Sequence, residues 1–92
     1  MRSVEYKRSF DKSFRTLNLE CRQKTQETIQ ELLTALESSK IPQGLDLKRL
    51  QGDQWEARVD IHLRLCFRMK KDLVEFALVG THDDIKNFLK NY

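Results

Sequence analysis

The chain has 92 residues, of which 39% are hydrophobic and 34% charged, with a net charge of +3 at pH 7. This length leaves room for one domain, residues 1–92, and the composition is typical of a small, highly charged soluble domain rather than a disordered tail. Because the sequence has no apolar stretch of membrane-spanning length and no signal peptide, the expected location is the cytoplasm. Cys21 and Cys66 are then expected to be reduced thiols.

The first half of the chain predicts a strand followed by two helices. Arg2–Lys7 alternates weakly between apolar and polar residues, which indicates a short strand. Ser9 is expected to cap the first helix, and Asn18 to cap a second one that runs from Leu19 to about Ser39. One face of each helix is marked by apolar residues at helical spacing: Phe10, Phe14 and Leu17 in the first, and Ile29, Leu32, Leu33 and Leu36 in the second.

The second half holds the most regular pattern in the chain. Pro42 and Gly44 end the second helix, and extended structure is expected to begin within Leu45–Leu50. From Trp55 to Met69 the odd positions are apolar and the even positions mostly charged, which places one face of a strand in the core. Because this stretch is much longer than a usual strand of about five or six residues, a turn is expected near Asp60–Leu63.

The end of the chain predicts a strand that leads directly into a helix. Leu73–Val79 is apolar on both faces, as expected of a strand in the middle of a sheet. Thr81 and Asp84 have the spacing of a variant capping box, so His82 is expected to be the first helical residue. There the free backbone N–H groups and the helix dipole favour an anion such as phosphate. The helix continues with apolar residues at helical spacing: Ile85, Phe88 and Leu89.

These elements together predict an α+β domain. It consists of an N-terminal strand, a two-helix hairpin packed on a mainly antiparallel four-stranded sheet, and a short C-terminal helix. The helices are expected on one face of the sheet, which leaves the other face or its rim for charged residues.

Basic residues gather in the predicted sheet. Arg58, His62 and Arg64 share the even positions of the alternating pattern, and His82 follows the neighbouring strand. Lys48 and Arg49 precede the first of these strands. Such a group provides cations for phosphate and two side chains that titrate near pH 7. A charged face that is merely solvated explains the same pattern, and the pattern alone leaves both interpretations open.

Four short sequence segments, in their order and spacing along the chain, resemble the RelE/ParE superfamily of toxins from bacterial type II toxin–antitoxin systems. They are Leu47–Gly52, Trp55–Val59, Leu63–Phe67 and Val79–His82. The resemblance covers essentially the whole chain and implies a RelE-like fold. The subgroup most similar is the RelE/YafQ type, whose members are ribosome-dependent mRNA endonucleases. The ParE type shares the scaffold but poisons DNA gyrase.

The resemblance implies a role for the residues around the last strand. His82 stands where YafQ-like toxins keep a catalytic histidine and RelE keeps an arginine. Arg64 matches the strand arginine with which RelE holds phosphate. Phe88 stands in the place of a catalytic tyrosine of RelE, and without the hydroxyl it can stack on a base but cannot donate a proton.

The remaining basic residues complete a hybrid set. Arg58 matches a position that is lysine in RelE and histidine in YafQ. His62 stands where YafQ has an acidic residue, and Lys48 stands where YafQ has another histidine. We therefore expect Arg64 and Arg58 to bind the phosphate with help from Lys48 and Arg49. His82 is expected to be the leading general acid or base and His62 its partner.

The expected chemistry is attack of the RNA 2′-hydroxyl on the adjacent phosphate, which gives a 2′,3′-cyclic phosphate. The sequence offers no convincing metal-ligand cluster, so neither a metal nor a cofactor is expected. The resemblance implies two partners, a cognate antitoxin and mRNA in the ribosomal A site, with no membrane and with DNA contacted only through the antitoxin complex. Two alternatives remain open: a ParE-like gyrase poison, and a degenerate member that only binds an antitoxin. For Lys86, Lys90 and Tyr92 we favour a role at the end of the last helix over contact with ribosomal RNA.

Overall fold

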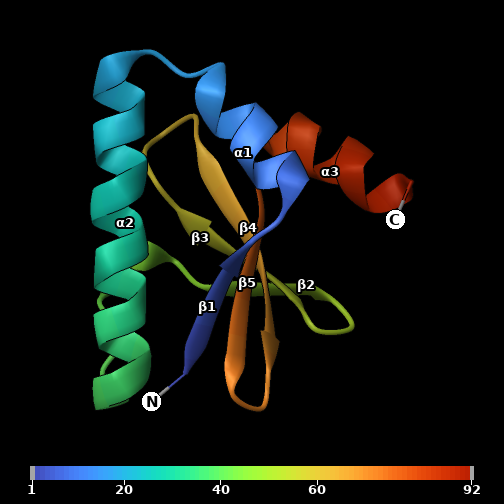
Figure 1. Cartoon of the computed structure of the whole chain (residues 1–92). Helices are drawn as coiled ribbons and strands as arrows, with labels where there is room; N and C mark the ends of the chain where they lie inside the picture. Colours follow the sequence, from blue (N-terminus) through green and yellow to red (C-terminus); the bar gives the residue numbers. More distant parts are fainter. Residues whose placement is uncertain (1, 92) are drawn as a thin grey trace.

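The computed structural model describes residues 2–91, and Tyr92 lies outside the described residues (Figure 1). Within this range the chain forms five strands, three α-helices and one short 3-10 helix, η1. In chain order they are β1 (Ser3–Tyr6), α1 (Arg8–Arg15), α2 (Leu19–Ser38), η1 (Gln43–Leu45), β2 (Lys48–Gln51), β3 (Gln54–Arg58), β4 (Arg64–Lys70), β5 (Leu73–Gly80) and α3 (His82–Lys90).

The strands form one mixed sheet with the order β1-β5-β4-β3-β2. β1 pairs with β5 in parallel, whereas the other neighbours are antiparallel. The expected α+β class and mainly antiparallel pairing are confirmed, but the sheet has five strands rather than four. The additional strand is the N-terminal strand β1, which joins the other four by pairing with β5. Residues 48–51 and 54–58 form a tight hairpin, in which Gly52 takes the positive φ of 54° that few other residues tolerate.

The turn predicted near Asp60–Leu63 is confirmed, and it separates β3 from β4. The backbone N–H of Val59 bonds the carbonyl of Leu63 at 2.9 Å, and Oδ1 of Asp60 accepts hydrogen bonds from the N–H groups of His62 and Leu63. The turn therefore brings the end of β3 beside the start of β4.

The main core lies between the sheet and helices α1 and α2. Its members come from the odd positions of the alternating pattern and from the helix stripes, and they include Phe10, Ile29, Leu32, Ala57, Leu65 and Phe67. Asn18 caps α2 as expected, since its side chain accepts a hydrogen bond from the N–H of Cys21 at 2.8 Å. Ser9 does not cap α1, which starts at Arg8; its hydroxyl instead donates to the carbonyl of Ala77 at 2.5 Å and ties the helix to β5.

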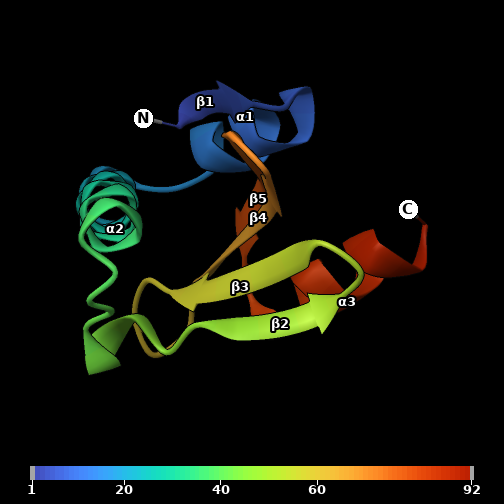
Figure 2. The same ribbon diagram turned by 90° about the horizontal axis from the view of Figure 1, so that it is seen from below.

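Helix α3 covers the opposite face of the sheet. Seen from below, the sheet runs between α2 and α3 (Figure 2). Cys66 and Ala77 are buried against Ile85 in a second, smaller core. The expectation of helices on one face is therefore wrong for α3. The reason is that small residues in β4 and β5 leave an apolar surface on the face that the alternating pattern assigned to solvent.

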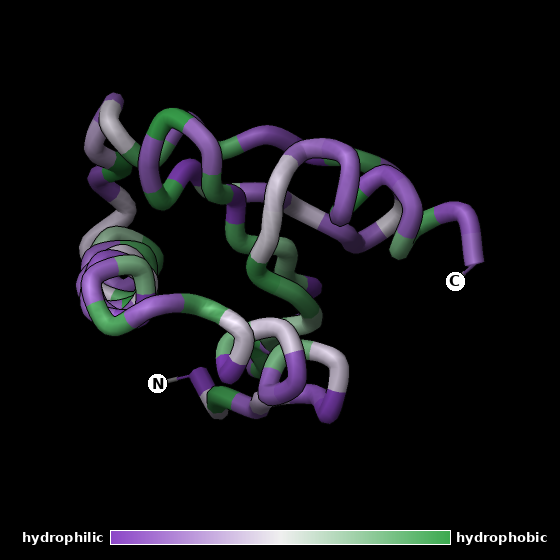
Figure 3. The backbone as a smooth tube through the Cα atoms, turned by 90° about the horizontal axis from the view of Figure 1, so that it is seen from above, coloured by the Kyte–Doolittle hydropathy of each residue, from purple (hydrophilic) through white to green (hydrophobic). Residues whose placement is uncertain are grey.

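Hydropathy along the backbone follows the two cores (Figure 3). Hydrophobic colour runs along the strands in the middle of the molecule, whereas hydrophilic colour dominates much of the helices. Strand β5 is buried on both faces, as the apolar run Leu73–Val79 predicted. Among the described residues, no helix combines the length and the apolar character needed to cross a membrane.

Candidate functional site

One end of the sheet carries three of the predicted basic residues. Arg58 and Arg64 are direct partners across the β3–β4 pair, and Arg64 is in turn the partner of Gly80 on β5. Gly80 leads into Thr81, the N-cap of α3, and His82 is the first helical residue, as predicted. The strand register therefore brings Arg58, Arg64 and His82 to the same end of the sheet.

A capping box fixes the start of α3. The hydroxyl of Thr81 accepts a hydrogen bond from the N–H of Asp84 at 3.1 Å, and Oδ2 of Asp84 accepts one from the N–H of Thr81 at 2.9 Å. This reciprocal pair satisfies two backbone donors of the first turn and holds the chain direction at the strand-to-helix junction. The exposed side chain of His82 therefore projects from a defined backbone position.

Two acidic residues that the sequence analysis did not single out hold the arginines. Nη1 of Arg64 lies 3.7 Å from Oδ2 of Asp46 and 3.7 Å from Oε2 of Glu56. Nη2 of Arg58 lies 3.8 Å from the same Asp46 oxygen. Asp46 is half exposed, whereas the Glu56 side chain is only 4% exposed. Asp46 therefore offsets the repulsion of two arginines that face each other across the strands.

A pocket of about 320 Å³ lies between the β2–β3 hairpin and α3. It joins predicted residues with ones that sequence reasoning missed. The predicted members are Arg49 and His82; the missed members are Glu56 and Lys86, and the apolar walls are Leu50, Ile85 and Leu89. His82, Lys86 and Leu89 meet there because positions i, i+4 and i+7 share one face of a helix. Lys86, which we expected to serve the helix end, instead lines this pocket.

Lys48 and His62 lie at the margins of the site. Lys48 is the partner of Glu56 across β2 and β3, so both side chains leave the same face of the sheet. His62 is exposed in the β3–β4 turn and is not among the residues that line the pocket. Burial raises the pKa of Asp60 in this turn, but hydrogen bonds from the N–H groups of Leu63 and His62, together with the nearby charge of Lys24, outweigh it and hold the pKa below its usual value.

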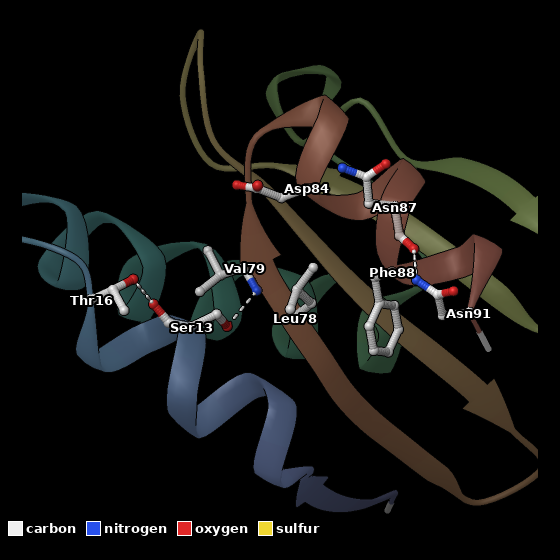
Figure 4. Close-up of a pocket in the computed structure, with 8 residues that line it drawn as sticks. All are labelled: Ser13, Thr16, Leu78, Val79, Asp84, Asn87, Phe88 and Asn91. Atoms are coloured by element: carbon white, nitrogen blue, oxygen red, sulfur yellow. Dashed lines mark hydrogen bonds between the residues drawn. The ribbon is translucent and has the colours of Figure 1, made fainter.

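Phe88 faces a different part of the molecule. It packs against the second core, and together with Ser13 of α1 and Thr16, which caps the end of α1, it lines a groove of about 620 Å³ between α1 and α3 (Figure 4). The hydroxyl of Ser13 accepts a hydrogen bond from the N–H of Val79 at 3.1 Å, which joins α1 to β5 at the floor of this groove. The structure therefore places Phe88 on the side of α3 away from the pocket that His82 lines.

The missed residues differ in the signal that they leave in the sequence. Glu56 stands at an even position among basic residues on the strands, and an acid in such a row is a detectable signal for an ion pair. Asp46 takes a left-handed conformation with φ 44° after η1, and only the folded turn brings it to the arginines. Lys86 becomes part of the site only because α3 packs on the unexpected face of the sheet.

Comparison with known proteins gives the fold. No protein-family model and no curated protein matches the sequence. Among solved structures, YafQ from E. coli strain BL21(DE3) is similar with a TM-score of 0.69 and 22% identity over 92% of this chain and 98% of that chain. A chain of the RelB–RelE antitoxin–toxin complex from Methanococcus jannaschii gives 0.69 and 18% over 92% and 98%.

A third similar structure is a YoeB/ParE toxin from Agrobacterium tumefaciens, with a TM-score of 0.67 and 15% identity over 87% of this chain and 98% of that chain. At these identities the likeness establishes the architecture. The chain therefore has the RelE/ParE-type toxin fold that the sequence predicted, with YafQ and RelE structures among its neighbours.

Proposed function

We propose that this chain is the toxin of a type II toxin–antitoxin system and acts as a ribosome-dependent mRNA endoribonuclease. The observation that carries the proposal is the meeting of Arg58, Arg64 and His82 at one end of the sheet in a fold shared with such toxins. Guanidinium groups bind phosphate in a planar, bidentate geometry, and an imidazole exchanges protons near neutral pH. This combination suits cleavage of a phosphodiester.

The proposed reaction uses the RNA's own nucleophile. The 2′-oxygen forms a bond to phosphorus as its proton passes to a general base, and the bond from phosphorus to the 5′-oxygen breaks as a general acid protonates that oxygen. His82 serves as one of these groups and His62 as the other, with Lys48 as a substitute. Each such proton transfer contributes about 10²–10⁴ in rate.

The arginines bind the charge that develops on the phosphate. Arg64 is held in place by Glu56 and Asp46, so little ordering remains to be done when the phosphate arrives. Arg58 supplies a second cation, and Arg49 lies at the rim of the adjoining pocket. Phe88 lacks a hydroxyl, so the proposed mechanism gives it no proton to transfer, and its place in the α1–α3 groove gives it a packing role.

A cognate antitoxin is the proposed protein partner, and the proposed site of action is the cytoplasm. One of the similar structures is an antitoxin–toxin complex, and two others are the DinJ–YafQ toxin–antitoxin complex and the YoeB–YefM complex. An acidic or amphipathic antitoxin segment complements this chain, whose net charge is +3. DNA would then be contacted only through the antitoxin.

Mapping of mRNA ends by primer extension in a purified translation reaction tests the proposal. We expect cuts within A-site codons that require the ribosome, and a loss of about 100-fold or more in His82→Ala because one proton transfer is removed. Lys12→Ala is the matched control, since it removes an exposed cation on α1 that does not line the pocket. Intact mRNA with folded wild-type protein would refute the endonuclease, and a gyrase supercoiling assay would then test the ParE-like alternative.

A further inference from the structure

Glu56 is a buried carboxylate that lacks the partners such a group normally has. Its side chain is 4% exposed, and within residues 2–91 its only partner is Nη1 of Arg64, 3.7 Å from Oε2. No hydrogen bond to the Glu56 carboxylate is present among the described residues, and 3.7 Å is too long for one. Because this largely buried carboxylate also lines the pocket in front of α3, its oxygens have acceptor capacity for a ligand.

The pocket in front of Glu56 has two chemically different zones. Leu50, Ile85 and Leu89 form apolar walls, whereas Arg49, His82 and Lys86 supply cations or proton donors. A cationic ligand is disfavoured by the basic groups. A flat ring that brings N–H donors to the carboxylate and carries a phosphate to the basic groups satisfies both zones, and this is the chemistry of a nucleotide.

We propose that this pocket binds a guanine base of the RNA substrate, with Glu56 as the residue that selects it. The inference rests on the proposed ribonuclease function and adds to it a base-recognition residue. The carboxylate accepts hydrogen bonds from N1–H and from the N2 amino group of guanine, while the apolar walls contact the faces of the ring.

The other bases match the carboxylate less well. Adenine and cytosine each place a ring-nitrogen acceptor next to their amino group, so one carboxylate oxygen would face a lone pair. Uracil offers a single N–H between two carbonyl oxygens, which repel the carboxylate. Guanine alone presents two adjacent donors on its Watson–Crick edge. A bidentate contact to a base typically discriminates against the wrong base by about 5- to 150-fold.

Titration with two mononucleotides, followed by NMR, tests the inference on the wild-type chain. Guanosine monophosphate and inosine monophosphate carry the same phosphate and ribose, but inosine lacks the N2 amino group. We expect guanosine monophosphate to shift the amide signals of Leu50 and Ile85 and to bind about 10-fold more tightly. Equal affinity for the two nucleotides, or no response of these signals to either, would overturn the proposal.

Glu56→Gln is the accompanying variant, because it keeps the size of the side chain and replaces one acceptor oxygen with a donor. We expect it to lose the preference for guanosine over inosine monophosphate. Glu75→Gln is the matched control: Glu75 also contacts an arginine, Arg68, at 3.4 Å, but it does not line the pocket. A retained preference in Glu56→Gln would overturn the proposal.

Cleavage mapped on the ribosome separates this inference from the function on which it rests. Normal A-site cleavage with no discrimination between guanosine and inosine monophosphate would overturn the guanine pocket alone. Selective binding of guanosine monophosphate without any mRNA cleavage would overturn the endonuclease alone.

Discussion

The guanidinium of Arg64 has a structural role as the ion-pair partner of Glu56 and a proposed functional role in binding phosphate. It faces Arg58 across the strands and lies beside the buried Glu56. The side chain of Arg64 is 19% exposed and that of Arg58 is 47% exposed. These two arginines therefore differ in how much of the surrounding structure depends on them.

We predict that Arg64→Ala lowers the free energy of unfolding by about 3 kcal/mol, because it leaves the Glu56 carboxylate buried without a cation. Arg58→Ala is the matched control and is expected to cost less than about 1 kcal/mol, since its ion pair is exposed. Urea unfolding of both variants measures the difference. Equal losses for the two variants would contradict this account of Glu56.

Arg64→Lys is the appropriate variant for activity assays. It keeps a cation near Glu56 while removing the planar fork that holds a phosphate. The sequence identified Arg64 as a phosphate-binding candidate from its position in the strand. It did not reveal the role of Arg64 as partner to a buried acid, because the burial of Glu56 depends on how α3 packs over the sheet.

Helix α3 depends at its start on the capping box of Thr81 and Asp84. Gly80 belongs to the same junction, since a Cβ at this position would lie 2.7 Å from Oδ2 of Asp84. Only a residue without a side chain leaves Asp84 free to bond the N–H of Thr81. Sequence and structure agree here because capping is local chemistry that a few adjacent residues determine.

We predict that Thr81→Ala costs about 1 kcal/mol of stability and also reduces mRNA cleavage, because His82 follows directly in the first turn. Asn18→Ala removes the equivalent cap of α2 and should cost a similar amount, but it lies far from His82 in the sequence and at another helix. Thermal unfolding and primer extension on both variants provide the comparison. Equal loss of cleavage in the two would attribute the effect to stability alone.

The face of the sheet on which α3 packs was beyond prediction from local pattern. The even positions of β3 and β4 read as solvent-exposed because most of them are charged. Cys66 is an even position as well, yet it is fully buried against Ile85. Period-two alternation identifies two faces but does not say what covers the second one. The surroundings of Phe88, Lys86 and Glu56 all depend on the packing of α3 against this second face of the sheet.

At the scale of the whole molecule, the second core links stability to pH. Burial, followed by the negative charge of Glu56, raises the pKa of the Cys66 thiol from 9.0 to about 12. The unfolded chain therefore loses this proton at a lower pH than the folded chain does. Below about pH 9 both states keep the proton and the thiol has no effect, whereas between about pH 9 and 12 ionisation favours the unfolded state.

We predict that raising the pH from 8 to 10 lowers the unfolding free energy of the wild type by about 1.4 kcal/mol more than that of Cys66→Ala, which has no thiol at this position. Urea unfolding of both proteins at the two pH values measures this difference. Parallel losses in the two proteins would show that the folded thiol ionises as readily as an unfolded one.

The parallel pairing of β1 with β5 also governs when the fold can form. Ser3 is the register partner of Leu73, and Tyr6 that of Phe76, so this pair joins segments 70 residues apart in a chain of 92. Contacts of such high contact order slow folding, because a large loop must close before they form. During synthesis β1 has no neighbour in the sheet until β5 has left the ribosome. The sheet of a nascent chain therefore remains incomplete, and its basic site unassembled, until β5, the strand that precedes His82, has left the ribosome.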